Sequence, residues 1–374
     1  MIYFDYAAAA PIAEEALEVF IEASRRFYAN SSSLHDEGSS AKELLELSRK
    51  QLAETAGIAK EGVIFTSGGS ESNMLALQTY TSMTKKNHII ASSTEHSSLS
   101  NYLKKLKGEG YEITYLKHSP DGRISLSHLQ ESIKDTTFLV ICGHVNSEIG
   151  CVQDLAAIKA VIGTRDIFLH GDCVQSFGKL SLEEAVLACD SLSISAHKIY
   201  GPKGTGALLF PAIHKLKPPT PDVSHEMGFR TGTVNVPAAA SFAAAAALIE
   251  ATREDEFVRI SALREQFKQE LLQMGVPHEI IESPLDHQLP HIIGVIFPGH
   301  QGQYVMLELN SRGYAVSTGS ACQIGKQEPS RTMMALGKSN EEAKSLIRIS
   351  MGKNTTENHI SGICQHLCAI INNR

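Results

Sequence analysis

The stretch SISAHKIYGPKGTG, residues 193–206, places a lysine, Lys198, between an apolar run that predicts a β-strand and a turn rich in glycine and proline. On its own, a lysine in this position is most often a solvated charge. In open α/β sheets, however, ligands bind at the carboxyl ends of the strands. The residues that end the other strands therefore decide whether Lys198 is a surface charge or part of a binding site.

Helical patterns alternate with short apolar runs from residue 14 to about residue 210. This alternation predicts an α/β domain with a mostly parallel sheet. The apolar runs are VIF at 63, HII at 88, EITYL at 112, FLVIC at 138, IFLH at 167 and LSIS at 192.

The amino-acid composition of the chain changes after Pro237, where the alanine-rich run AAASFAAAAALIEATREDEF begins. Its high helix propensity and its length predict a helix that can bridge two domains. We place the boundary near residue 247, with a large domain over residues 14–246 and a small domain over residues 1–13 and 247–374. The apolar run HIIGVIF and the Gly/Ser-rich segment STGSACQIGKQEPS suit a small α+β domain with a loop that we expect to move.

Charge and hydropathy restrict the classes of partner. The 374 residues include 34 Lys and Arg and 41 Asp and Glu, without a long basic run, which argues against nucleic acid and against a polybasic membrane contact. No apolar run approaches the length of a membrane span, and the stretch MIYFDYAAAAP lacks the features of a secretory signal. We therefore expect a cytoplasmic protein whose partners are small molecules or other proteins.

The cysteines are odd in number and scattered, which predicts reduced thiols rather than a disulfide framework. Cys364 and Cys368 lie one helical turn apart in CQHLC, a spacing that could hold a metal. An amphipathic terminal helix explains the same spacing better, so we predict no metal site. The seven cysteines are at positions 142, 151, 173, 189, 322, 364 and 368.

The segment TSGGSESN follows the apolar run VIF and has the composition of an anion-binding turn. Gly68 and Gly69 free the backbone, and Ser70 can cap the helix that follows. The N–H groups at the start of that helix could then hold an anion, although a capped turn without a ligand explains the same residues.

Each later strand also ends in polar side chains that could touch one ligand. A phosphate near a helix N-terminus, a flat ring under an aromatic lid, a ring nitrogen beside a carboxylate and an aldehyde beside a lysine together describe pyridoxal 5'-phosphate. Asp172 would keep the ring nitrogen protonated, His96 would stack on the ring, and Gln175 would bond its phenolic oxygen. Lys198 would reach the aldehyde. The residues predicted to bind this cofactor are Gly69, Ser70, His96, Asn146, Asp172, Gln175, Ser195, His197 and Lys198.

Taken in order, the motifs of the chain resemble those of cysteine desulfurases of the NifS/IscS type, in the class V aminotransferase family. The resemblance covers nearly the whole chain. Asp172 and the lysine motif mark the aminotransferase-like superfamily at large, whereas STGSAC followed by EPS is more specific. The motifs are YFDYAAAAP, TSGGSESN, TEH, HVNSEIG, HGDCVQSFGK, SAHKIYGPKGTG, FRTGT, STGSAC and IRIS.

The resemblance implies a fold, an activity and further site residues. The fold is the aminotransferase-like fold type I, in which a seven-stranded large domain binds the cofactor and the small domain carries the catalytic cysteine. The activity converts L-cysteine to L-alanine and leaves a persulfide on Cys322, with Lys198 and His96 transferring protons. Arg348 in LIRIS and Asn146 would bind the substrate, and Thr233 would reach the phosphate of the neighbouring subunit in a homodimer. Sulfur-acceptor proteins such as an iron–sulfur scaffold would be the partners.

The residues around Cys322 also support its role, because it lies among small residues that favour movement and access to a ligand. Cys142 and Cys173 lie at strand ends, where we expect burial. Other lyases of the superfamily, such as a selenocysteine lyase or a kynureninase, would need such a cysteine less strictly. A non-enzymatic assembly partner with the same fold is the alternative outside enzymes, but Lys198, Asp172 and Cys322 argue against it.

Two segments depart from the family pattern. Ala9 and Ala10 stand where the first motif usually has two threonines, and TPDVSHEMG replaces the glycine run before FRTGT. These changes leave the roles of His225 and Glu226 open. The variant segments and GDCVQ resemble a subgroup associated with the iron–sulfur cluster of quinolinate synthase, which would link the chain to NAD biosynthesis.

Overall fold

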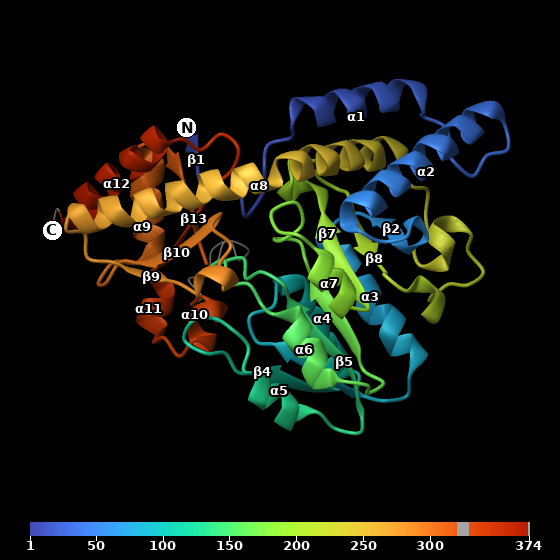
Figure 1. Ribbon diagram of the computed structural model, residues 1–374, viewed down its shortest axis with the longest axis horizontal. Helices are drawn as coiled ribbons and strands as arrows, with labels where there is room; N and C mark the ends of the chain where they lie inside the picture. The colour runs from blue at the N-terminus through green and yellow to red at the C-terminus, as the bar shows by residue number, and fades with distance from the viewer. Residues whose placement is uncertain (320–328, 373–374) are drawn as a thin grey trace.

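The computed structural model describes residues 1–319 and 329–372 of the chain. Its largest element is a seven-stranded sheet with the order β2-β8-β7-β6-β5-β3-β4 (Figure 1). Strand β8 is antiparallel to both of its neighbours and the remaining pairs are parallel, which confirms the predicted mostly parallel sheet. The strands are β2 (Val63–Thr66), β3 (His88–Ser92), β4 (Glu112–Leu116), β5 (Thr137–Gly143), β6 (Phe168–Asp172), β7 (Ser191–Ser195) and β8 (Gly206–Leu209).

Helices cover both faces of this sheet because its strands are apolar on both sides. Ile90 packs into a core shared with α2, α6 and α8, whereas the adjacent Ile89 packs into a core shared with α3 and α4. The alternation along each strand therefore supplies two apolar layers. The helices of this part of the chain are α1 (Glu14–Arg26), α2 (Asp36–Ala56), α3 (Gly69–Met83), α4 (Ser97–Gly108), α5 (Leu126–Ser132), α6 (Leu155–Ile162), α7 (Glu183–Ala188) and α8 (Val236–Gln273).

A smaller antiparallel sheet with the order β12-β13-β10-β9 forms the second layered unit, as the predicted α+β domain requires. The first strand of the chain belongs to this side, because β1 pairs with β11 and Phe4 packs in its core. The elements are β1 (Ile2–Tyr3), β9 (Glu279–Ile281), β10 (Ile292–Ile296), α9 (Gly302–Ser311), β11 (Tyr314–Ala315), β12 (Ser317–Thr318), α10 (Arg331–Ala335), α11 (Asn340–Lys344), β13 (Leu346–Ser350) and α12 (Glu357–Asn372).

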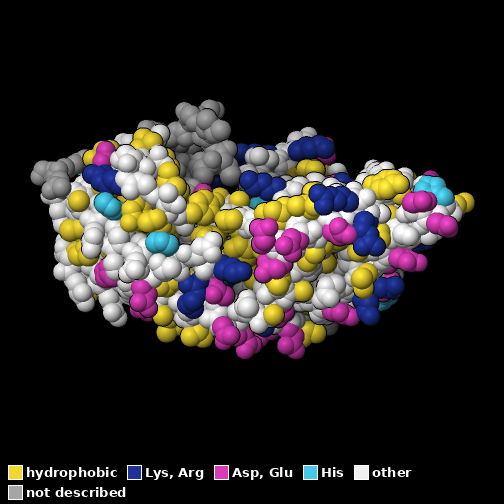
Figure 2. Space-filling model, turned by 90° about the horizontal axis from the view of Figure 1, so that it is seen from above, with side chains coloured by type: hydrophobic (Ala, Val, Ile, Leu, Met, Phe, Trp, Pro, Cys, Tyr) yellow, Lys and Arg dark blue, Asp and Glu magenta, His cyan; other side chains and the backbone are white. Residues whose placement is uncertain are grey.

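Helix α8 runs along the top of both units (Figure 1). Its residues up to Ile249 pack in the core of the large sheet, and those from Ile260 onward pack in the core of the small unit. Between these positions its side chains form ion pairs at the surface, such as Arg253 with Glu250 at 3.1 Å. The face seen from above accordingly mixes acidic, basic and apolar side chains (Figure 2). The boundary at residue 247 lies inside this helix, so the division of the chain there stays a prediction.

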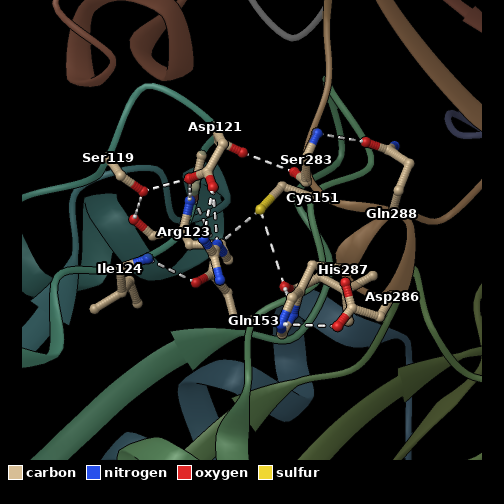
Figure 3. A network of polar contacts seen from close by, with 12 residues as sticks. Ser119, Asp121, Arg123, Ile124, Cys151, Gln153, Ser283, Asp286, His287 and Gln288 are labelled. Atoms are coloured by element: carbon tan, nitrogen blue, oxygen red, sulfur yellow. Dashed lines mark hydrogen bonds and ion pairs between the residues drawn. The ribbon is translucent and has the colours of Figure 1, made fainter.

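Polar contacts connect the two units beyond α8 (Figure 3). The Ser283 hydroxyl of the small unit donates to the Asp121 carbonyl of the large unit at 2.7 Å. The Asp121 carboxylate accepts from Arg123 Nε at 2.9 Å, and Gln153 Oε1 accepts from the Ile124 N–H at 2.8 Å. The first of these bonds joins the two units, and the other two lie within the large unit around residues 121–124. In the described part of the chain, no helix is long and apolar enough to cross a membrane.

A buried ion pair fastens the variant segment TPDVSHEMG to the edge of the large sheet. Arg49 binds both carboxylate oxygens of Glu226, at 2.7 and 2.9 Å, and the Phe65 N–H donates to the same carboxylate at 2.6 Å. The backbone of Glu226 has a positive φ of 43°, which L-residues rarely adopt. The bonds from Arg49 and from the edge strand β2 offset this strain, which gives Glu226 a structural role.

We expect Arg49→Met to lower the free energy of unfolding by about 3–5 kcal/mol, because it leaves the Glu226 carboxylate buried without its cation. The double variant Arg49→Met/Glu226→Gln should recover much of this loss, since no charge is then buried. Denaturant unfolding measures both. Arg26→Met, which breaks an exposed pair with Glu22, is the control and should change little. A loss below about 1 kcal/mol in Arg49→Met would contradict the assignment.

Candidate active site

A cavity of about 680 Å³ lies at the carboxyl ends of β5, β6 and β7, where residues from the small unit close it on one side. It brings together most of the residues that the sequence singled out. Thr233 is exposed and does not line this cavity, and Cys322 lies outside the described residues. The predicted residues that line the cavity are Gly69, Ser70, His96, Asn146, Asp172, Gln175, Ser195, His197, Lys198 and Arg348.

Lys198 ends a short 3-10 helix (Ala196–Lys198) that directly follows β7. Its Nζ donates to the carbonyl oxygens of Ala7 and Ala8, both at 2.6 Å. The turn that follows is tight, because Tyr200 has a positive φ of 64°. Main-chain carbonyls from the N-terminal segment therefore aim the lysine amine into the cavity.

The N-terminus of α3 supplies main-chain N–H groups to another wall of the cavity. Gly68 precedes the helix with a φ of 143°, and its position provides no side-chain cap. A Cβ atom on Gly69 would lie 2.4 Å from Val174 Cγ2, so only glycine fits there without displacement. The uncapped N–H groups and the helix dipole make this end of α3 suitable for a phosphate.

His197 and Ser195 lie close to each other in the same cavity. The Ser195 hydroxyl and His197 Nδ1 are 2.9 Å apart. Burial, followed by the positive charges of Lys198 and Lys203, lowers the pKa of His197 to about 4. The neutral ring can still donate one N–H, so the pair offers hydrogen bonds to an anion at the α3 N-terminus.

Asp172 ends β6 and is held by two donors. Asn73 Nδ2 donates to Oδ2 at 2.8 Å, and the Val174 N–H donates to Oδ1 at 3.0 Å. His170 in turn lies 3.0 Å from Asn73 Oδ1, which fixes the orientation of the amide. These hydrogen bonds fix the orientation of the Asp172 carboxylate, which lines the cavity. Asn73 was not singled out from the sequence, although it is the last residue of the quoted TSGGSESN.

His96 is the N-cap of α4. Its Nδ1 accepts from the Ser98 N–H at 3.2 Å, so the neutral ring carries its proton on Nε2. Burial is the largest influence on its pKa, and the charges of Lys198 and Arg331 add to it while Asp172 opposes them. The net effect lowers the pKa, which keeps the imidazole neutral and able to exchange a proton.

Gln175 provides an independent test of the cofactor hypothesis. Its Nε2 donates to the Ala7 carbonyl at 2.9 Å, but its buried Oε1 has no partner among the described residues. A buried polar atom without a partner costs free energy unless a ligand satisfies it. The unpaired amide, the Asp172 carboxylate, the Lys198 amine and the α3 N-terminus together fit pyridoxal phosphate.

Asn146 and Arg348 lie on the side that faces the small unit. Asn146 Oδ1 accepts from the Glu148 N–H at 2.9 Å, and its Nδ2 donates to Thr332 Oγ1 at 3.2 Å. Arg348 Nη2 pairs with Asp5 at 2.7 Å, while its buried Nε has no partner in the described chain. This free donor leaves Arg348 able to bind a substrate carboxylate.

Further residues line the cavity that the sequence did not point out as functional. Arg331 follows the quoted EPS directly, and its Nη1 donates to Ser100 Oγ at 2.5 Å. Glu95 is the middle residue of TEH, and Glu148 lies within HVNSEIG. Arg331 is adjacent to a quoted motif and the two glutamates lie within one, so their position was the available signal. Ala10 stands where the family motif usually has a threonine. It is held through its main chain, because the Ala10 N–H donates to the His197 carbonyl at 2.8 Å.

A family model described as aminotransferase class-V matches residues 2–363. The chain therefore belongs to the aminotransferase class-V family, which confirms the family resemblance and the fold class. It is 43% identical over 359 residues to the putative cysteine desulfurase NifS of Bacillus subtilis, covering 95% of this chain and 91% of the relative. It is 36% identical to the cysteine desulfurase IscS of Photorhabdus laumondii, covering 96% of this chain and 90% of the relative.

Solved structures agree with this assignment. A structure titled NIFS-LIKE PROTEIN superposes with a TM-score of 0.91 at 28% identity, over 100% of both chains. A structure titled "SspA in complex with cysteine" superposes with a TM-score of 0.80 at 32% identity, over 94% of this chain and 99% of the other.

Gly69→Ala should weaken the binding of pyridoxal phosphate by the cofactor-free protein, because the added methyl would push the α3 N-terminus away from Val174. Overpacking of this kind also costs about 1–3 kcal/mol of stability. Titration with pyridoxal phosphate and with inorganic phosphate measures the first effect. Gly108→Ala is the matched control, since its methyl would enter open space. Equal affinities in the two variants would contradict the phosphate site.

Proposed function

We propose that this protein is a pyridoxal-phosphate-dependent cysteine desulfurase that converts L-cysteine to L-alanine and holds the sulfur as a persulfide on Cys322. The observation that carries the proposal is the convergence of Lys198, Asp172, His96 and the α3 N-terminus on one cavity. The aminotransferase class-V family is generally dependent on pyridoxal phosphate. Full-length relatives named cysteine desulfurase support the choice of reaction.

The cofactor would occupy the floor of the cavity. The α3 N-terminus, Ser195 and His197 would hold its phosphate, Asp172 would pair with its ring nitrogen, and Gln175 would bind its phenolic oxygen. Lys198 would form the covalent link to its aldehyde. When bound, the cofactor supplies an electron sink for the bonds of the substrate.

The chain's own groups would orient the substrate and move its protons. Arg348 would bind the L-cysteine carboxylate, and Asn146 lies close to the same place. Lys198 Nζ would accept the proton of the substrate α-carbon once the substrate amine has displaced it. His96, whose lowered pKa keeps its ring neutral, would exchange a proton with the substrate from the side opposite Lys198.

Cys322 would be the sulfur acceptor. Its sulfur bonds to the substrate sulfur, the bond between that sulfur and the substrate carbon breaks, and the carbon gains a proton. One thiol and L-cysteine thus become a persulfide and L-alanine, and no outside oxidant is needed. Gly319 and Pro329, which flank residues 320–328, both line the cavity. By contrast, burial raises the pKa of the Cys142 and Cys173 thiols well above the usual value, which makes both poor nucleophiles.

The remaining expectations belong to the same proposal. The exposed Thr233 would complete the phosphate site of a neighbouring subunit, so the active form would be a homodimer. An iron–sulfur scaffold would accept the sulfur, with a link to quinolinate synthase, and the protein would work in the cytoplasm. A selenocysteine lyase or an inactive assembly partner has less support, because the named relatives are cysteine desulfurases.

Lys198→Ala should reduce alanine release from L-cysteine by about a hundredfold or more, because both the covalent link and the proton acceptor are lost. Some pyridoxal phosphate should still bind, since the phosphate site and Asp172 remain. Alanine assays and dialysis with labelled cofactor measure the two effects. Lys50→Ala, at an exposed position on α2, is the control. Near wild-type alanine release by Lys198→Ala would refute the assignment.

Cys322→Ser should stop alanine production but leave cofactor binding intact, because a hydroxyl cannot accept the sulfur. Mass spectrometry of the wild-type protein after incubation with L-cysteine should find one added sulfur on the peptide that contains Cys322. Cys368→Ser, on α12 in the small unit, is the control and should keep full activity. Full alanine production by Cys322→Ser, or added sulfur only at Cys364 or Cys368, would disprove the persulfide mechanism.

A further inference from the structure

Glu95 is a buried carboxyl group in the wall of the cavity that the proposed mechanism does not use. It lies in the turn between β3 and α4, directly before His96, and is 7% exposed. Its Oε1 accepts from the Gly143 N–H at 2.8 Å. Its buried Oε2 has no hydrogen-bond partner among the described residues, and the ion pairs of the described chain do not include Glu95.

Asp172 supplies a second carboxyl group to the same part of the cavity. Gly143, which binds Glu95, is the register partner of Asp172 across the parallel strands β5 and β6. Glu95 follows β3 and Asp172 ends β6, so both residues lie beside Gly143 at the end of β5, the strand between β3 and β6. Asp172 accepts from the Asn73 amide and from the Val174 N–H, whereas the Glu95 carboxyl accepts from the Gly143 N–H and lies near the Ser92 hydroxyl. Two neighbouring carboxyl groups with unequal surroundings divide into one acid and one carboxylate.

The other titratable groups nearby agree with this division. Burial, followed by the negative charge of Asp172, raises the pKa of Glu95 to about 8, although the Gly143 N–H and the Ser92 hydroxyl oppose the shift. Burial keeps the Cys142 thiol protonated, and His96 is neutral because its pKa is lowered. Lys198 lines the same cavity, where its Nζ donates to the carbonyls of Ala7 and Ala8.

We propose that Glu95 is a positioning residue that remains a neutral carboxylic acid in the folded protein, so that the negative charge of the pair stays on Asp172. A neutral Glu95 anchors β5 through Gly143 without adding a second negative charge to the pocket. A charged Glu95 would instead repel Asp172 and the phosphate of the cofactor. The inference rests on the proposed function only in the role that it gives Asp172 toward the cofactor.

The cofactor-free protein tests the charge of Glu95 without any catalysis. Between the unfolded value of 4.5 and about 8, the unfolded chain has released the Glu95 proton while the folded protein retains it. The free energy of unfolding contributed by Glu95 therefore falls as the pH rises through this window. Glu95→Gln removes this dependence. The melting temperature of Glu95→Gln minus that of the wild type should therefore increase by about 5 °C between pH 5 and pH 8.

Glu71→Gln is the matched control, because Glu71 lines the same cavity but is ionised. Burial raises the pKa of Glu71, but the hydrogen bonds from Arg230 and the Ser67 N–H outweigh it and lower the pKa overall. Its stabilising effect is therefore fully present above the unfolded pKa of 4.5 and does not change between pH 6 and pH 8. The melting temperature of Glu71→Gln relative to the wild type should be constant over that range.

Titration of the cofactor-free proteins with pyridoxal phosphate tests the effect on the site. Glu95→Gln should match the wild type at pH 6 and bind several-fold more tightly at pH 9, where only the wild type carries the added charge. Melting curves of Glu95→Gln and wild type that stay parallel from pH 5 to pH 8 would overturn the proposal. An affinity ratio that is the same at both pH values would also overturn it. Absence of alanine production by the wild type would refute the desulfurase function and leave the result on Glu95 standing.

Discussion

The carbonyl oxygen of Ala7 accepts hydrogen bonds from Lys198 Nζ at 2.6 Å and from Gln175 Nε2 at 2.9 Å. This one acceptor aligns the residues that follow β6 and β7. It belongs to a segment that is itself anchored on the small unit, because the Ala7 N–H donates to Ser350 Oγ at 2.9 Å. The geometry of the site therefore depends on the docking of the N-terminal segment between the two units. Because the cavity lies between the two units, it combines Lys198 and Asp172 of the large unit with Arg348 of the small unit.

Burial sets the protonation states in this cavity. It lowers the pKa of His96 and of His197, and it raises the pKa of Glu95 and of Glu148. The common cause is that a charge loses hydration when it leaves water, which favours the neutral form of acids and bases alike. Asp172 is held by two donors in the same cavity, the Asn73 amide and the Val174 N–H.

Prediction from the sequence succeeded where the signal was local. Each quoted apolar run of the large domain became a strand, and the residues that follow β6 and β7 do line one cavity. Prediction missed Asn73 and Glu95, although both stand in quoted motifs. Their roles depend on contacts with strands distant in sequence, such as Asn73 with Asp172 and Glu95 with Gly143. A pattern of residue types carries no information on which distant group a buried side chain will meet.

The sequence by itself determined the fold class and the chemistry of the strand ends, because apolar periodicity and turn residues act over a few neighbouring positions. The motifs also identified the family. Only the tertiary structure decided that Arg348 is held by Asp5 while its Nε has no partner among the described residues, that Arg49 binds Glu226, and that Lys198 is aimed by main-chain carbonyls. These arrangements arise from the packing of segments far apart in the chain, where burial makes each unpaired polar group costly and so selects its partner.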